Sequence, residues 1–318
     1  MKPLVSVYCL AYNHEKYIKD ALEGFVHQET NFPYEVIVHD DASTDKTKSI
    51  IMEYAEKYPD TIIPIYQSEN QYSKGGSIFS QFILPLLRGK YIAVCEGDDY
   101  WCDMYKLQKQ VNWLEKHEEY SLCVHNSKIL NCISGEEGLI NPGDKDRDIT
   151  IGEIIEWRGN LFQTSSYMFR AEYACVPPAF FVKGVGDYSR AVYLATCGKV
   201  RYLSDIMSVY RYLTSGSWSI KMYKSTGNSD KSITHWQSRI DMLKRIKPFI
   251  DEEYVDSINK TIRRNEFNIL YKQNNLKTII KDYPDIYRQL SIKDKIRILI
   301  CSICPNILKL YNKIMNNL

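Results

Sequence analysis

The stretch YIAVCEGDDYW, residues 91–101, joins an apolar segment to three carboxylates. Its first five residues, Tyr91–Cys95, have the aromatic and β-branched character of a short buried strand. Glu96, Asp98 and Asp99 follow at once. Carboxylates this close together repel one another and are costly to desolvate unless a cation or a hydrogen-bond donor compensates them. The segment is therefore either a solvated turn or a cation site.

The residues around this stretch alternate between strand-like and helical patterns. Short runs rich in β-branched and aromatic residues predict strands over Leu4–Leu10, Tyr34–His39, Ile62–Tyr66 and Tyr91–Cys95. Apolar residues at helical spacing predict intervening helices over Glu15–His27, Thr44–Tyr58 and Ser77–Leu87. This order predicts an α/β fold in which helices flank an open, mostly parallel sheet.

Polar clusters follow three of the predicted strands. The first is AYNHEKY, residues 11–17, the second is HDDASTDKT, residues 39–47, and the third contains Glu96, Asp98 and Asp99. Ligands of open α/β sheets bind beyond the carboxyl ends of the strands, so we expect the three clusters to share one crevice. Oxygen ligands favour Mg²⁺ or Mn²⁺. In the second cluster, Asp41 and Ser43 either make turn and cap hydrogen bonds or place a carboxylate against a nucleotide base.

The rest of the chain predicts further alternating elements and then a helical tail. We expect a helix over Met104–His117 and a surface loop over Ser134–Asp148. The remaining elements of the body are strands near Leu122–His125, Lys128–Cys132, Gln163–Arg170, Val200–Leu203 and Ile206–Tyr210, and a helix over Tyr188–Thr196. A boundary near Gly227 divides the chain into a domain of residues 1–227 and a helical extension of residues 228–318.

Charge is distributed unevenly along the chain. The net charge of +2 gives no indication of nucleic-acid binding, yet residues 231–318 carry 17 Lys and Arg against 9 Asp and Glu. Within this basic extension, Ile292–Tyr311 is amphipathic. It either packs on the body of the protein or lies on an anionic membrane surface.

Cysteine use and hydropathy bear on localisation. The 9 Cys are scattered, and Met1–Ala11 lacks a signal-peptide pattern, so we expect a cytoplasmic protein with reduced thiols. No run of 18 apolar residues predicts a membrane span. Peripheral attachment to the inner face of the plasma membrane is compatible with the basic extension.

In the motifs at its strand ends, the segment of residues 4–219 resembles the inverting glycosyltransferases of family 2, which have the GT-A fold. SVYCLAYNHEKYI is similar to the first strand and turn of that family, and EVIVHDDASTDKT to its second strand and acidic loop. GKYIAVCEGDDYWCDMYKLQKQ resembles the metal-binding DxD region. FQTSSYMFR resembles a strand near the acceptor site, and KGVGDYSRAVYLATCGKVRYLSDIMSVYR the region that holds the catalytic base.

The resemblance implies roles for individual residues. Asp41 would contact the nucleobase, with Tyr12, Asn13 and Glu15 around it. Asp99 would bind the metal, and Asp98 would contact the metal and the ribose or donor sugar, whereas Glu96 stands where the family often has Asp. Asp187 would be the base that deprotonates the acceptor hydroxyl, and as the first acidic residue of a predicted helix it is equally suited to N-capping.

The resemblance also implies a function. It is transfer of a sugar from a nucleotide-diphosphate donor, typically a UDP-sugar, to a saccharide or a polyprenyl-diphosphate-linked saccharide during capsule, O-antigen or exopolysaccharide synthesis. The family often has His near Tyr212–Thr214, and this chain has none there. No QxxRW motif of processive synthases is present. The alternatives are a nucleotidyltransferase, against which the absence of Gly in AYNHEKY argues, and an inactive nucleotide-sugar-binding module.

Overall fold

The computed structural model describes residues 1–140, 144–157, 161–223, 231–273 and 275–303. The chain forms two compact units. The first comprises Met1–Phe181 and Asp187–Lys224, and the second comprises Val182–Gly186 and the chain from Ser225 onward. The predicted boundary at Gly227 lies outside the described residues.

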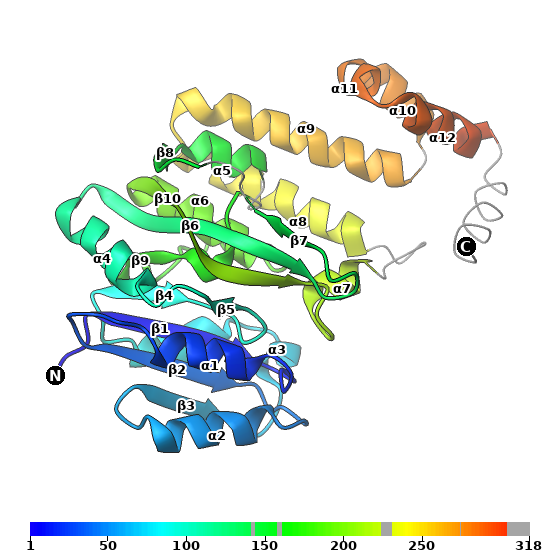
Figure 1. Cartoon of the computed structure of the whole chain (residues 1–318). Coiled ribbons are helices and arrows are strands. Elements are labelled where there is room, and N and C mark those ends of the chain that lie inside the picture. The colour runs from blue at the N-terminus through cyan, green and yellow to red at the C-terminus, as the bar shows by residue number, and fades with distance from the viewer. Residues whose placement is uncertain (141–143, 158–160, 224–230, 274, 304–318) are drawn as a thin grey trace. The chain divides into compact units, whose positions relative to one another are not determined.

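One mixed sheet organises the first unit. Its strands are, in spatial order, β3 (Ile62–Tyr66), β2 (Tyr34–Asp40), β1 (Val5–Ala11), β4 (Tyr91–Val94), β9 (Met168–Arg170), β6 (Tyr120–Asn131), β10 (Lys199–Tyr212) and β5 (Tyr100–Trp101). Two short strands, β7 (Glu137–Leu139) and β8 (Arg147–Ile149), pair with β6 and β10. Figure 1 shows the strands stacked from β3 to β10.

The direction of the strands determines where their ends meet. Strands β1 to β4 are parallel, β9 is antiparallel to both β4 and β6, and β10 is parallel to β6. The strands β6 and β10 therefore run in the same direction as β1 to β4, and their carboxyl ends lie at the same edge of the sheet. The predicted open, mostly parallel α/β sheet is confirmed.

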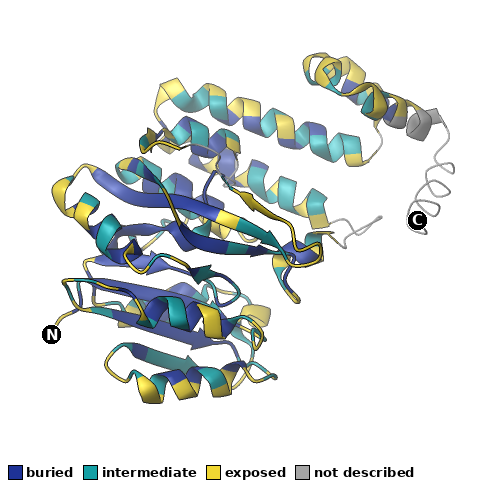
Figure 2. Ribbon diagram, viewed as in Figure 1, coloured by how far each residue is buried: buried dark blue, intermediate teal, exposed yellow. Residues whose placement is uncertain are grey.

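Helices flank this sheet. In the first unit they are α1 (Ile18–Val26), α2 (Thr47–Lys57), α3 (Gln71–Lys74), η1 (Phe79–Ile83), η2 (Leu84–Leu86), α4 (Lys106–Lys116), α5 (Ile151–Trp157), η3 (Thr164–Ser166), η4 (Ala171–Tyr173), α6 (Gly186–Cys197) and α7 (Trp218–Tyr223). Their inner faces are apolar at helical spacing, as α1 illustrates with Ile18, Ala21, Leu22 and Phe25. In Figure 2 most of the strands are buried, whereas the helices are exposed on their outer faces.

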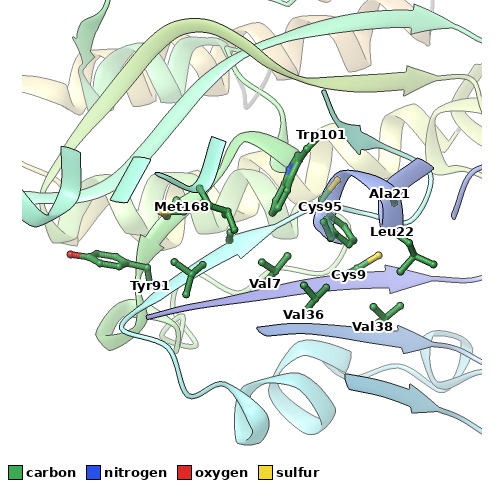
Figure 3. Packing of buried hydrophobic residues seen from close by; sticks show 14 of the residues in the cluster. Val7, Cys9, Ala21, Leu22, Val36, Val38, Tyr91, Cys95, Trp101 and Met168 are labelled. Atoms are coloured by element: carbon green, nitrogen blue, oxygen red, sulfur yellow. The ribbon is translucent and has the colours of Figure 1, made fainter. Parts of the chain in front are cut away.

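The main core lies between β1, β2, β4 and α1. Val7 and Cys9 of β1 and Val36 and Val38 of β2 are fully buried on one face, at the two-residue spacing that a strand requires. Trp101 packs with them from β5, and Figure 3 shows its ring among these side chains. This packing holds the ends of β1, β2 and β4 in fixed relative positions.

Several predicted elements differ in detail. The predicted helix over Ser77–Leu87 is a π-helical turn followed by a 3₁₀ turn, because Pro85 cannot donate the backbone hydrogen bond of a regular helix. The two predicted strands before Cys132 are the single strand β6. The two after Val200 are the single strand β10, whose register shifts at Ile206. The predicted loop after Ser134 contains β7 and β8.

The second unit is helical. It contains α8 (Lys231–Ile246), η5 (Lys247–Phe249), η6 (Glu252–Tyr254), α9 (Val255–Lys272), α10 (Leu276–Asp282), α11 (Pro284–Gln289) and α12 (Ile292–Ile303). Helices α8 and α9 pack together and bury Leu243, Ile246 and Ile258. The predicted C-terminal helices are confirmed. Among the described residues, no helix combines the length and the apolar character that crossing a bilayer requires.

Candidate active site

Three strained turns mark the edge where the parallel strands end. Asn13 follows β1, Ala42 follows β2 and Leu213 follows β10, and their φ angles are 57°, 60° and 64°. They are the only non-glycine residues with positive φ in the described part of the chain. This conformation is disfavoured for Ala and Leu, and strained backbone of this kind concentrates at functional sites.

Asn13 and Glu15 connect the turn after β1 to the loop after β2. The Asn13 N–H donates to Ser43 Oγ at 2.9 Å, and the Thr44 N–H donates back to Asn13 Oδ1 at 2.8 Å. The Glu15 N–H donates to Asp45 at 3.1 Å, and Glu15 accepts from the Lys46 N–H at 3.1 Å. The two loops therefore form one rigid wall.

The other two residues predicted for the donor pocket differ in exposure. Tyr12 is 44% exposed beside this wall, whereas Asp41 is buried at the end of β2. The two carboxylate oxygens of Asp41 accept from the backbone N–H groups of Gln71 and Tyr72, at 2.7 Å and 3.1 Å. Asp41 thus holds the start of α3 against the end of β2.

Gly97 brings the turns after β1 and β4 together. A Cβ atom at Gly97 would lie 2.8 Å from His14 Nδ1 and 3.1 Å from the Ala11 side chain, so any other residue here would force these side chains to shift. The His14 ring is in this contact, and burial lowers the pKa of His14, although Asp98, Asp45 and Asp40 act in the opposite direction. The predicted convergence of the three polar clusters is therefore observed around His14.

Asp98 and Asp99 are both held by the end of β10. The Thr214 hydroxyl donates to Asp98 Oδ2 at 2.8 Å, and the Arg211 backbone N–H donates to Asp99 Oδ1 at 2.9 Å. Asp99 is only 4% exposed. Burial raises the pKa of Asp99 well above its usual range, and Asp98 adds to this, while Arg211 partly opposes it. This crowding of negative charge favours a cation nearby.

Glu96 and Asp187 add two further carboxylates to the same edge. Burial raises the pKa of Glu96 well above its usual range, and the charges of Asp187, Asp98 and Asp99 contribute in that order. Asp187 and the turn after β4 are therefore close enough to interact electrostatically. The structure brings together a base candidate from α6 and an acidic turn from β4, although they are some ninety positions apart in the sequence.

Asp187 lies in the first turn of α6. Although the residue reaches solvent, its carboxyl group lies beside Thr164, and desolvation raises the pKa of Asp187. Arg190 and a hydrogen bond with the Thr164 side chain act in the opposite direction. A helix start is expected to lower the pKa of a carboxyl group. The net direction at Asp187 is upward, because desolvation outweighs the stabilising donors.

The acidic turn fits a divalent ion only in part. In the described residues, no group of three or more His, Cys, Asp or Glu side chains is arranged to hold a metal ion. Two adjacent carboxylates, Asp98 and Asp99, are nevertheless the donor set that Mg²⁺ or Mn²⁺ uses when substrate phosphates and water complete the coordination. The residues present therefore fit an ion that arrives with a phosphate-bearing substrate.

Three residues of this edge were not predicted from the sequence. Arg211 and Thr214 contact the acidic turn from β10, and Arg190 lies near Asp187 with its guanidinium 4.3 Å from the centre of the Phe79 ring. Arg211 and Thr214 act over more than a hundred residues, so neither spacing nor periodicity indicates them, whereas Arg190 lies one helical turn after Asp187 on α6. The available signals were the Tyr210–Arg211 pair in the predicted base region and the place near Tyr212–Thr214 where the family often has His.

Comparison with known proteins identifies the family. A family model described as "Glycosyl transferase family 2" matches residues 6–168. An uncharacterised protein of Mycobacterium tuberculosis is 36% identical over 218 residues, which are 67% of this chain and 60% of that protein. This chain thus matches about three fifths of that relative's length. The glucosyltransferase WfaP of Escherichia coli, named for UDP-Glc and α-D-GlcNAc-diphosphoundecaprenol, is 33% identical over 117 residues, 37% of this chain and 43% of WfaP.

Two solved structures share the fold. Residues 1–349 of S. aureus TarS in complex with UDP-GlcNAc superpose with a TM-score of 0.60 and 16% identity, over 93% of this chain and 78% of TarS. The mannosyltransferase PcManGT of Pyrobaculum calidifontis, in complex with GDP-Man and Mn²⁺, gives a TM-score of 0.58 and 16% identity, over 98% of this chain and 83% of PcManGT. At this identity the likeness establishes the fold, which is of the GT-A type.

Proposed function

Because the chain belongs to glycosyl transferase family 2, we propose that it transfers a sugar, with inversion, from a nucleotide-diphosphate donor to a hydroxyl group of a saccharide acceptor. The donor is a UDP-sugar, and the acceptor is a saccharide or a polyprenyl-diphosphate-linked saccharide of capsule, O-antigen or exopolysaccharide synthesis. The observation that carries the proposal is the electrostatic proximity of Asp187 to the acidic turn of Glu96, Asp98 and Asp99.

Asp187 is the catalytic base in this proposal. Inverting transfer needs one carboxylate to remove the proton from the attacking hydroxyl, on the face of the sugar opposite the leaving nucleotide. Asp187 enters the site from α6, whereas the acidic turn enters from β4, so base and diphosphate contacts come from different elements. The Thr164 side chain acts to lower the pKa of Asp187, which favours the ionised form that a base needs.

Asp98 and Asp99 would hold a divalent ion, Mn²⁺ or Mg²⁺, together with the donor diphosphate. When bound, such an ion supplies neutralisation of the negative charge that develops on the departing diphosphate. Asp99 is the principal ligand, since it is buried and fixed. Asp98 contributes a second oxygen and contacts the ribose or donor sugar.

The donor base would lie against the wall made by Tyr12, Asn13, Glu15 and Asp41. Each carboxylate oxygen of Asp41 already accepts one backbone N–H, and a carboxylate has about four lone-pair sites, so one more donor is accommodated. A base N–H is such a donor. The exposed Tyr12 ring offers an apolar surface beside it.

The test is transfer by point variants of the full chain, with a panel of nucleotide sugars and release of the nucleotide as readout. Asp187→Asn keeps the size and capping ability of the side chain but removes its basicity, so transfer should fall about 10²–10⁴-fold while donor affinity is retained. Asp99→Asn should abolish metal-dependent activity. Asp205→Asn, an exposed carboxylate, is the matched control. Wild-type rates in Asp187→Asn would reject Asp187 as the base.

We also propose that the basic extension, residues 228–318, is a separate domain that binds an anionic membrane surface from the cytoplasmic side. On α12, Ile292, Ile296 and Leu299 follow one another at four- and three-residue spacing and are 76%, 51% and 48% exposed. Lys293 and Lys295 flank this stripe by helical position, and Ile298 is buried on the other side. Apolar stripes with flanking lysines favour the interface of anionic bilayers.

Flotation with phosphatidylglycerol vesicles tests the membrane proposal. Ile296→Glu should reduce binding of the full chain at low salt. Ile280→Glu, at an equally exposed position on α10, should not. Equal binding by both variants, or none by wild type, would reject α12 as the contact.

A further inference from the structure

The end of β10 makes three hydrogen bonds to the Asp98–Asp99 turn. The Arg211 backbone N–H donates to Asp99 Oδ1 at 2.9 Å, the Thr214 hydroxyl donates to Asp98 Oδ2 at 2.8 Å, and Arg211 Nη1 donates to the Asp98 carbonyl at 3.1 Å. Each carboxylate is thus held through one oxygen. The other oxygen of each, Asp98 Oδ1 and Asp99 Oδ2, has no hydrogen bond within the described residues.

Arg211 is itself fixed. It is 8% exposed, and its guanidinium lies 4.4 Å from the centre of the Tyr100 ring and 5.4 Å from that of Tyr17. Its Nη2 forms an ion pair with Asp20 of α1. The guanidinium is planar and always charged, so these contacts on its faces and edge define one orientation. The position of the acidic turn is thereby connected to α1.

Thr214 is fixed in a different way. It is 1% exposed and follows Leu213, whose positive φ reverses the chain direction. The Leu213 N–H donates to Ser219 Oγ at 3.0 Å, and Ser217 Oγ donates to the Thr214 carbonyl at 2.8 Å. The turn is therefore closed by its own hydrogen bonds, and the Thr214 hydroxyl is held in place for Asp98.

We infer that Arg211 and Thr214 are positioning residues for the divalent ion and its nucleotide diphosphate. By occupying one oxygen of each aspartate, they leave the other oxygen in a fixed place as a ligand. This rests on the proposed function, because it assigns the ion to Asp98 and Asp99. Removing a residue that orients a metal ligand typically lowers metal affinity about 10–100-fold.

The test measures binding of Mn²⁺ in the presence of UDP, and in parallel of GDP, by electron paramagnetic resonance of the free ion. Thr214→Val preserves the shape of the side chain and removes the donor, so Mn²⁺ should bind about 10-fold or more weakly. Thr214→Ser keeps the hydroxyl and should bind Mn²⁺ nearly as wild type. Thr196→Val, which removes a hydroxyl bonded only to its own helix, is the control.

A second variant tests the contribution of Arg211 and leaves the buried Arg211 side chain in place. Asp20 is about half exposed, and Asp20→Asn removes the charge that pairs with Arg211. Mn²⁺ affinity should fall several-fold with little change in unfolding temperature. Wild-type affinity in Thr214→Val, in a protein that binds Mn²⁺ normally before substitution, overturns the positioning role alone. Absence of Mn²⁺ binding by wild type with either nucleotide overturns the metal site, and the proposed function loses this support.

Discussion

Lys106 is a fully buried amine, and its charge should cost the protein stability. It is the first residue of α4, its exposed fraction is 0%, and its Nζ lies 3.8 Å from the centre of the Trp101 ring without a hydrogen-bond partner in the described residues. Desolvation lowers the pKa of Lys106 from an ordinary 10.5 to about 7. At 1.36 kcal/mol per pH unit, the protonated amine destabilises the fold by about 5 kcal/mol below pH 7.

The sign of the pH dependence follows from the same values. Between about pH 7 and 10.5 the unfolded chain keeps the proton on Lys106 and the folded chain releases it, so this residue makes stability rise with pH. From pH 7 to pH 9 the gain is about 2 kcal/mol. Buried thiols such as Cys9 and Cys95, whose pKa values burial raises, act in the opposite direction at alkaline pH. The contribution of Lys106 to the pH dependence of stability is therefore measured by comparing wild type with a variant that lacks the amine.

The assay is urea unfolding of wild type and Lys106→Met at several pH values from 6 to 9. Methionine has a similar length and keeps a sulfur–aromatic contact with Trp101. The variant should be more stable than wild type at pH 7, and its advantage should shrink by about 2 kcal/mol by pH 9. Lys109→Met is the control. Partial burial lowers the pKa of Lys109, but hydrogen bonds with Asp103 and Asp205 raise it overall.

The pH dependence of the stability change shows whether Lys106 acts through the cost of burying its charge or only through its packing. Lys109→Met should lose a small, pH-independent amount of stability, because Lys109 stays protonated in both states over this range. If Lys106→Met is less stable than wild type at every pH, and the difference does not change between pH 7 and 9, then Lys106 keeps its proton when folded and its charge is compensated inside the protein. The reasoning from burial would then be wrong.

Three further predictions concern the active-site edge. Gly97→Ala should destabilise the fold by about 1–3 kcal/mol, because its Cβ would meet His14 Nδ1 at 2.8 Å; an unchanged thermal midpoint would contradict this. Asp41→Asn replaces one acceptor by an amide donor facing a backbone N–H, so urea unfolding should show a loss of about 1–3 kcal/mol together with weaker nucleotide binding. Transfer should decline on acidification at a higher pH than an ordinary aspartate would give, because the pKa of Asp187 is raised; a rate that stays constant down to about pH 4 would exclude Asp187 as the base.

Local patterns were sufficient for the elements that precede the site. The strands β1 to β4 follow from runs of β-branched and aromatic residues, and the position of Asp98 and Asp99 at a strand end follows from the strand itself. The burial of Lys106 was also accessible in principle. It lies on the same face of α4 as Leu107, Gln110 and Leu114. Because lysine is seldom buried, however, there was no reason from the sequence to place this one in the core.

The contacts that give the site its geometry have no local signature. Asp41 is held by backbone N–H groups thirty residues away, and Asp99 by the backbone of Arg211, more than a hundred residues away. A backbone donor is the same for every residue type, so sequence alone cannot indicate which segment supplies it. The acidic residues were predictable because their chemistry is in their side chains. Their orientation was not, because it depends on where β10 ends relative to β4, and this is a property of the whole sheet.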